Sequence, residues 1–167
     1  IEERTRAIVN DVAARGDEAL LELTARFDGA KLRPDQLVVT TSEKFNASLI
    51  ADEELRDAVE AAHRNIQAFS KKSLRKKWSA RNRQNARVGE KFDPFRRVGI
   101  YIPGGTAPLV STALMTVTLA KTAGCPEIVV CTPCSAEGQV NSALLYALNI
   151  AGATEVYRAG GAQAIAA

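Results

Sequence analysis

Apolar residues recur every three or four positions through the first 70 residues, a pattern that predicts amphipathic helices. The first helical stripe is interrupted at Gly16 and stops at Asp28 and Gly29; its members are Ile8, Val9, Val12, Leu20, Leu23 and Phe27. A second helix is expected to begin at Asp52, an N-cap residue followed by two glutamates. Its apolar stripe comprises Leu55, Val59, Ala62, Ile66 and Phe69, all expected to be buried. Between the two helical regions, the apolar run 37–39 predicts a short edge strand.

After residue 97 the pattern changes to short strands that alternate with helices. Strands are predicted at 98–102, 127–131 and 155–157, and helices at 111–122 and from Asn141 to about residue 151. Each strand–helix unit takes about 28 residues, a length typical of βαβ crossovers, which predicts a parallel sheet with right-handed connections. The predicted fold class is therefore α/β: a helical N-terminal region, 1–70, and an incomplete Rossmann-like parallel sheet, 98–167.

The segment 71–97 between these regions is interpreted as a basic linker. Residues 71–91 contain nine lysines and arginines but only one acidic residue, Glu90. The presence of Trp78 makes nucleic acid an alternative partner, because basic residues neutralise phosphates and tryptophan stacks on bases. The modest net charge of +3 and the lack of a recognition motif argue against that alternative. A solvated connector and a surface that meets another subunit both remain open.

Composition sets the broad class of protein. With 46% hydrophobic and 25% charged residues, the 167-residue chain resembles ordinary globular proteins rather than disordered ones. No apolar run approaches 18 residues, so no membrane-spanning helix is predicted. Three cysteines without a signal-like start favour a reducing compartment, and we expect a cytoplasmic protein. The chain starts at Ile1 inside a helical pattern and ends in the helix-forming run 162–167, so we expect it to be a fragment.

The strongest local motif is the run VGIYIPGGTAP at 98–108. Here a strand leads into Gly104 and Gly105, which let backbone N–H groups approach an anion or phosphate. Tyr101 adds an aromatic ring with a polar tip at the carboxyl end of the strand, where open α/β sheets bind ligands. The motif is neither a dinucleotide fingerprint nor a Walker loop. The alternative is that these residues only turn a strand into a helix.

A similar arrangement follows the third strand. Gly160 and Gly161 lead into a short helix whose first turn would contain Gln163. At one edge of a parallel sheet, the two glycine pairs could converge on one ligand, with the amide of Gln163 pointing into the same crevice. The alternative is two unrelated turns.

Two other possible sites are not favoured. Cys131 and Cys134 have the spacing of a redox dithiol or of half a zinc site, but no second cysteine pair or nearby histidine completes a metal site. We interpret them as small apolar side chains at a strand end. His63, the only histidine, is interpreted as a surface or boundary residue of its helix.

In its motifs the chain resembles the histidinol dehydrogenase family. The resemblance is specific in the runs 98–108, 111–115, 123–125 and 159–167 (AGGAQAIAA), and more diffuse at 15–20 and 27–28. It implies a zinc-binding, NAD-dependent homodimer that oxidises L-histidinol to L-histidine through a bound aldehyde, in histidine biosynthesis. By this resemblance Tyr101 and Gln163 contact NAD, while Gly104, Gly105, Gly160 and Gly161 form backbone turns.

The remaining family residues fall outside this sequence. A third NAD contact (the asparagine of a G-P-G-N motif), the zinc ligands, the substrate-binding residues and the acid–base pair would all follow residue 167. We therefore expect no catalytic and no metal-binding residue in the chain, and no turnover of histidinol by the chain alone. Two alternatives remain: a non-catalytic dimerisation or scaffold module, and a relative that oxidises another small alcohol.

Overall fold

The computed structural model describes residues 1–104 and 108–167, and a three-stranded parallel sheet lies at its centre. The strand order is β3-β4-β5, with β4 paired on both sides. These strands are β3 (Arg97–Tyr101), β4 (Glu127–Thr132) and β5 (Glu155–Arg158). The predicted α/β class and parallel sheet are confirmed, with strand bounds within two residues of those expected.

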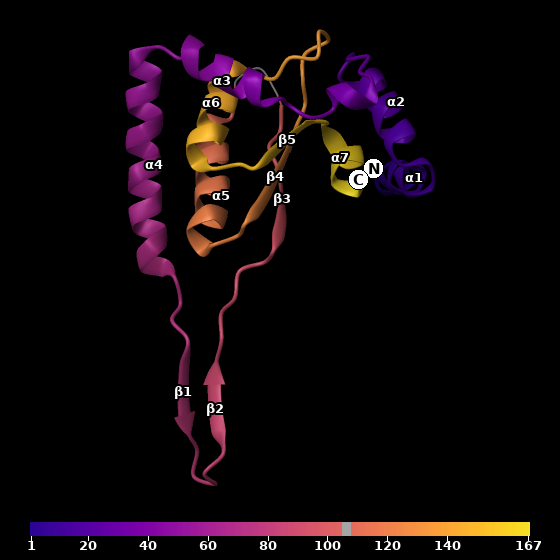
Figure 1. Cartoon of the computed structure of the whole chain (residues 1–167). Helices are drawn as coiled ribbons and strands as arrows, with labels where there is room; N and C mark the ends of the chain where they lie inside the picture. The colour runs from indigo at the N-terminus through magenta and orange to yellow at the C-terminus, as the bar shows by residue number, and fades with distance from the viewer. Residues whose placement is uncertain (105–107) are drawn as a thin grey trace.

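Two helices cover one face of the sheet, α5 (Val110–Ala123) and α6 (Ser142–Ala151) (Figure 1). Asn141 caps α6, because its side-chain oxygen accepts from the backbone N–H of Leu144 at 3.2 Å. Both helices end at a glycine with positive φ, Gly124 and Gly152. Between sheet and helices lies the main core, with Ile102, Val117, Ile128, Val130, Ala147, Leu148 and Val156 at 0–1% exposure.

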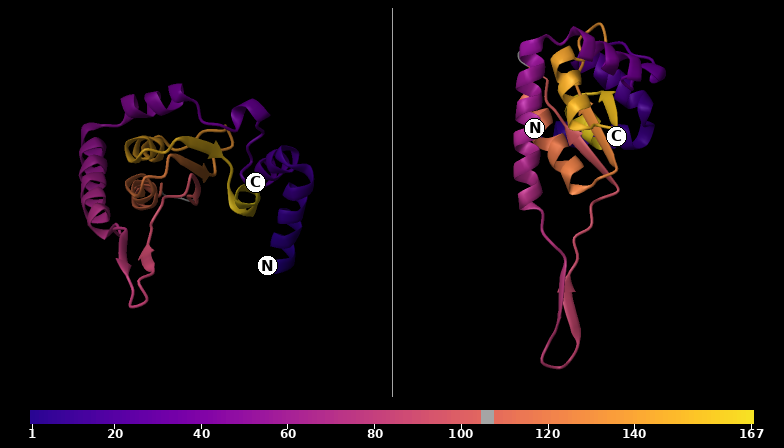
Figure 2. Two further views of the ribbon diagram at one scale, coloured as in Figure 1. Left: turned by 60° about the horizontal axis from the view of Figure 1, so that its bottom comes forward. Right: turned by 60° about the vertical axis from the view of Figure 1, so that its left-hand side comes forward.

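Two further helices form an outer layer over α5 and α6 (Figures 1 and 2). They are α3 (Thr41–Ile50) and α4 (Glu53–Ser73). Asp52 caps α4 as predicted, but the expected burial of the whole α4 stripe is wrong at its end. Val59 is 2% exposed, whereas Phe69 is 75% exposed. Near Phe69, α4 and α5 leave an open apolar hollow of about 540 Å³, so nothing covers that ring.

The first helices lie on the other side of the sheet, beside the last one (Figure 1). These are α1 (Glu2–Arg15), α2 (Asp17–Phe27) and α7 (Gly161–Ala166). After α2, the 3₁₀ turn η1 (Pro34–Gln36) leads to the predicted edge strand, which is reduced to one antiparallel bridge between Val38 and Tyr157. The backbone N–H of Val39 donates to Val156 O at 2.8 Å, so this segment still closes the β5 edge.

Within 71–97 the chain forms an antiparallel ribbon that the sequence reading did not predict. Its strands are β1 (Trp78–Arg81) and β2 (Arg87–Glu90), and they extend away from the rest of the molecule (Figures 1 and 2). The turn between them is locally specified: the Asn82 side chain accepts from two backbone N–H groups, and Asn85 adopts φ 65°. Every strand residue of the ribbon is exposed.

We expect the ribbon to open independently of the core. A two-stranded ribbon alone is marginally stable in water, so its amides should exchange with solvent at least ~100-fold faster than the β4 amides. Hydrogen exchange followed by NMR tests this, with Val88 and Val130 as reporters in the two regions. Equal protection at both positions would contradict it and would show that the ribbon is held in solution by a further contact.

Candidate functional site

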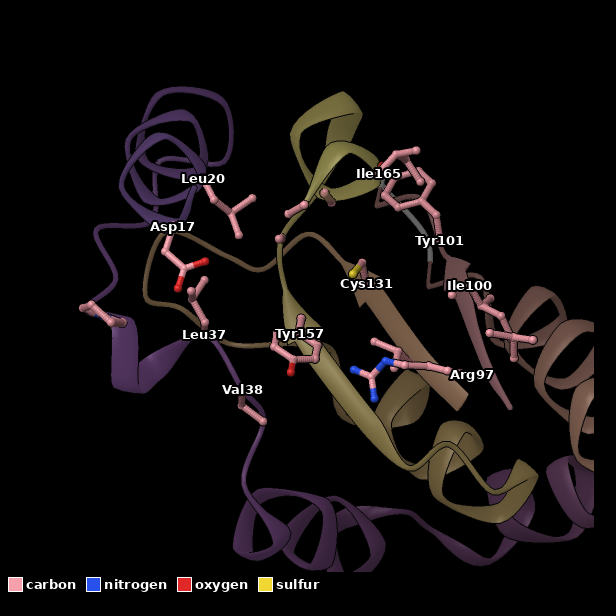
Figure 3. A pocket seen from close by; sticks show the side chains of 17 residues that line it. Asp17, Leu20, Leu37, Val38, Arg97, Ile100, Tyr101, Cys131, Tyr157 and Ile165 are labelled. Atoms are coloured by element: carbon pink, nitrogen blue, oxygen red, sulfur yellow. The ribbon is translucent and has the colours of Figure 1, made fainter. Parts of the chain in front are cut away.

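The face of the sheet opposite α5 and α6 is partly open. A hollow of about 640 Å³ lies between this face, α2, α7 and the 34–38 segment (Figure 3). From β4 and β5 it is lined by Val129, Cys131 and Tyr157, which alternate with buried residues, and from β3 it is lined by all five residues, 97–101, including Tyr101. In the middle of β3, a Cβ added to Gly99 would meet no described atom within 4 Å, which shows how little covers the sheet there.

The two glycine loops, for which convergence on one ligand and two unrelated turns were the alternatives, lie close together at the carboxyl end of the sheet. The backbone N–H of Gly161 donates to the phenol oxygen of Tyr101 at 3.1 Å. The ring of Pro133 lies between the loops, and a Cβ added to either Gly104 or Gly160 would be 2.8 Å from its Cγ. Only glycine permits this approach on both sides of Pro133. Gly105 lies outside the described residues.

Gln163 lies in the first turn of α7, as predicted, but its side chain is in an unusual state. It is 1% exposed, and neither its amide nitrogen nor its amide oxygen has a hydrogen-bond partner among the described residues. Such an orphaned buried amide costs roughly 1–3 kcal/mol and calls for an explanation, for which a bound ligand is one candidate. The Gln163 side chain also packs closely against Gly161: a Cβ added to Gly161 would lie 2.6 Å from the amide oxygen of Gln163.

The predicted site residues do not share one cavity. Tyr101 lines the open sheet face, whereas Gln163 lines a smaller hollow of about 300 Å³ beside α1 and the end of α2. Gly104 borders a third hollow, of about 700 Å³, that reaches the start of α6. The Tyr101–Gly161 hydrogen bond connects the first two hollows through the backbone of the α7 loop.

Next to this site, Arg158 holds three chain segments together, a role that the sequence reading missed. Its side chain is 6% exposed and donates to the backbone oxygens of Gln36, Val38 and Gly138 at 2.7–2.9 Å. It also forms an ion pair with Glu43 of α3. The sequence could have indicated the position of Glu43, the acidic partner, because Thr40 and Glu43 form the capping box of α3.

The Glu43 carboxylate should make stability sensitive to acid. Burial raises the pKa of Glu43, but hydrogen bonds from Arg158 and Thr40 outweigh this and hold the pKa below its ordinary 4.5. Because the folded-state pKa is depressed, the ion pair stabilises the fold above pH ~4.5 and its contribution is lost as the pH falls through the folded value. Between pH 7 and 3, urea unfolding should show a smaller loss of stability in Glu43→Gln than in the native chain. Glu54→Gln, at an exposed position, should behave like the native chain; identical acid profiles for Glu43→Gln and native would contradict the assignment.

The alternative sites have no support in the geometry. Burial raises the pKa values of Cys131 and Cys134, which opposes a reactive thiolate. His63 is half-buried, as predicted for a boundary residue, and its Nδ1 lies 3.0 Å from the Thr118 hydroxyl. Within residues 1–104 and 108–167, no group of three His, Cys, Asp or Glu side chains is placed to hold a metal ion. In the same residues, no helix is both long and apolar enough to cross a membrane.

Comparisons with known proteins agree on one family. The family model described as histidinol dehydrogenase matches residues 1–167. Histidinol dehydrogenases from Methanopyrus kandleri and Synechococcus sp. are 47% and 42% identical over 163 and 166 residues, which are 96% and 99% of this chain. The crystal structure of histidinol dehydrogenase from Elizabethkingia anophelis superposes with a TM-score of 0.93, at 34% identity over 99% of the chain. In each case the chain spans 38% of the relative's length.

Proposed function

Because the chain belongs to the histidinol dehydrogenase family, we propose that residues 1–167 form part of the cofactor-binding region of an enzyme that oxidises L-histidinol to L-histidine with NAD. The observation that carries the proposal is the meeting of the two glycine loops beside a buried amide without a partner. The Gly161 N–H donates to the Tyr101 hydroxyl, and Gln163 lies two residues further on, with neither polar atom of its amide paired among the described residues.

These residues fit a dinucleotide in specific ways. When bound, NAD supplies the hydride acceptor for the oxidation. Gly104 and Gly160 let the ring of Pro133 pack closely between the two loops, which holds the loops side by side at the carboxyl end of the sheet, where open α/β sheets bind dinucleotides. The Tyr101 hydroxyl orients the Gly160 and Gly161 loop, and the Gln163 amide offers one donor and one acceptor to a polar group of the cofactor.

Zinc, a homodimer and a cytoplasmic location are also part of the proposal. Zinc would need ligands from outside residues 1–104 and 108–167, since no group of three His, Cys, Asp or Glu side chains within them is placed to hold a metal ion. A homodimer is proposed because one face of the sheet is partly open and a chain of this fold needs it covered. Three free cysteines are compatible with the proposed cytoplasmic location.

Production of NADH from L-histidinol by the complete polypeptide encoded around this sequence tests the proposal. We expect turnover by the complete polypeptide and none by residues 1–167 alone. Tyr101→Phe should raise the KM for NAD about tenfold, because the Gly161 N–H loses its acceptor and the loop loses its orientation. Tyr146→Phe, on α6 at the opposite face of the sheet, serves as the matched control. Oxidation of a different small alcohol in preference to histidinol would contradict the substrate assignment, and NADH production by residues 1–167 would contradict the expected inactivity.

A further inference from the structure

Unpaired buried polar atoms gather in one place in the described residues. Five buried side-chain atoms lack a hydrogen-bond partner, and three of them belong to Asp28 and Gln163. These two side chains line the same hollow of about 300 Å³, bounded by α1, the end of α2 and the first turn of α7. Native proteins leave few such atoms unpaired, so three on two side chains that line one hollow point to a ligand that pairs with them.

Asp28 is tied to the cofactor loop as well as to the hollow. Its Oδ2 atom lies 3.2 Å from where a Cβ on Gly160 would be, so it lies directly against the second glycine loop. Burial raises the pKa of the Asp28 carboxyl, and the backbone N–H of Gly160 offsets only part of that rise. The carboxylate is therefore incompletely solvated in the free protein, a state that a hydrogen-bond donor from a ligand would relieve.

The rim of the same hollow is positively charged. Arg4 lines it, and the guanidinium groups of Arg4 and Arg26 both lie 5.5 Å from the centre of the Phe27 ring. The cavity thus offers an acceptor carboxylate and an amide inside, with cationic groups at its edge. A sugar with vicinal hydroxyls next to a phosphate has the complementary arrangement: donors for the carboxylate and negative charge for the arginines.

We propose that Asp28 is a cofactor-binding residue whose carboxylate accepts hydrogen bonds from the hydroxyls of one ribose of NAD, with the Gln163 amide as its partner in the same hollow. This inference rests on the proposed function and extends the binding site to the end of α2, a helix distant in sequence from both glycine loops. Carboxylates commonly bind the ribose hydroxyls of dinucleotides, although here the acid comes from a helix end rather than from the end of a strand.

The experiment measures the affinity of the complete polypeptide for NAD. It combines removal of a ribose hydroxyl from the ligand with removal of the carboxylate from the protein. The probes are NAD and its two singly 2′-deoxy forms, one for each ribose, titrated into the native protein and into Asp28→Asn. In the native protein, one deoxy form should bind at least ~10-fold more weakly than NAD, because it cannot satisfy the carboxylate. In Asp28→Asn, NAD itself should bind about tenfold more weakly, and the gap between NAD and that deoxy form should fall below about twofold.

This coupling distinguishes a direct contact from an effect through the loop. Equal weakening of NAD and both deoxy forms by Asp28→Asn would show that Asp28 only positions Gly160, and would overturn the inference. If the native protein binds all three ligands equally well, the inference is overturned. This test needs no variant, so it also applies if Asp28→Asn folds poorly. Asp57→Asn, exposed on α4, is the control and should change none of these affinities. Absence of NAD binding by the native protein would overturn the proposed function together with this inference, whereas NAD binding without the coupling would overturn the inference alone.

Discussion

Replacing Arg158 by methionine is expected to lower the free energy of unfolding by about 3–5 kcal/mol, mainly because three backbone oxygens lose a charged donor at roughly 1–3 kcal/mol each. The methionine side chain fills similar volume, but it leaves three backbone oxygens and the Glu43 carboxylate without their donor. Those oxygens come from the η1 segment, the 37–39 edge and the turn before α6, so the loss would loosen three connections at once. Urea or thermal unfolding of the native and variant chains measures the effect.

Arg97→Met is the matched control for that experiment. Arg97 also bonds two carboxylates, Glu127 and Glu155, at 2.7–3.0 Å, but its side chain is 45% exposed compared with 6% for Arg158. Exposed ion pairs contribute roughly 0–1 kcal/mol because water competes for both partners. If Arg97→Met destabilises the chain as much as Arg158→Met, burial is not the reason for the effect and the interpretation of Arg158 is wrong.

Replacing Gln163 by leucine is expected to change stability and cofactor affinity in opposite directions. The free chain should be as stable as the native one or more stable, by up to about 1–3 kcal/mol, because both unpaired amide atoms are replaced by apolar groups of similar size. Affinity for NAD in the complete polypeptide should fall at least ~10-fold, since the cofactor loses its donor and acceptor. Such a residue is a cost to folding that is offset when the ligand binds.

Thermal unfolding of the chain and NAD titration of the complete polypeptide measure the two effects separately. Gln84→Leu, at the exposed tip of the ribbon, is the control for a glutamine-to-leucine change without burial, and it should alter neither quantity by much. A loss of stability in Gln163→Leu would mean that the amide has a structural partner. An unchanged NAD affinity would remove Gln163 from the proposed binding site.

Secondary-structure elements with local signals follow from the sequence alone. The alternating strands, the bounds of α5 and α6, and the Asn141 and Asp52 helix starts depend on side chains within a few residues, so they were predicted close to their observed bounds. Resemblance in the two glycine motifs identified the family, which the comparisons confirm. The capping box of α3 and the Asn82 turn of the ribbon were equally local and could have been found by the same reasoning.

Which residues distant in sequence come into contact depends on how the elements pack. The exposure of Phe69 depends on where α5 ends beside α4, and a helical stripe alone cannot show whether a neighbour covers its last turn. Likewise, Arg158 is buried against Gln36, and Asp28 lines the same hollow as Gln163. In each pair the two residues are more than a hundred positions apart in the sequence. Their hydrogen bonds and missing hydrogen bonds arise from packing α2, α3 and the edge segment around β5 and α7. Periodicity and composition carry no information on such pairings, because each side chain looks ordinary in its own stretch of sequence.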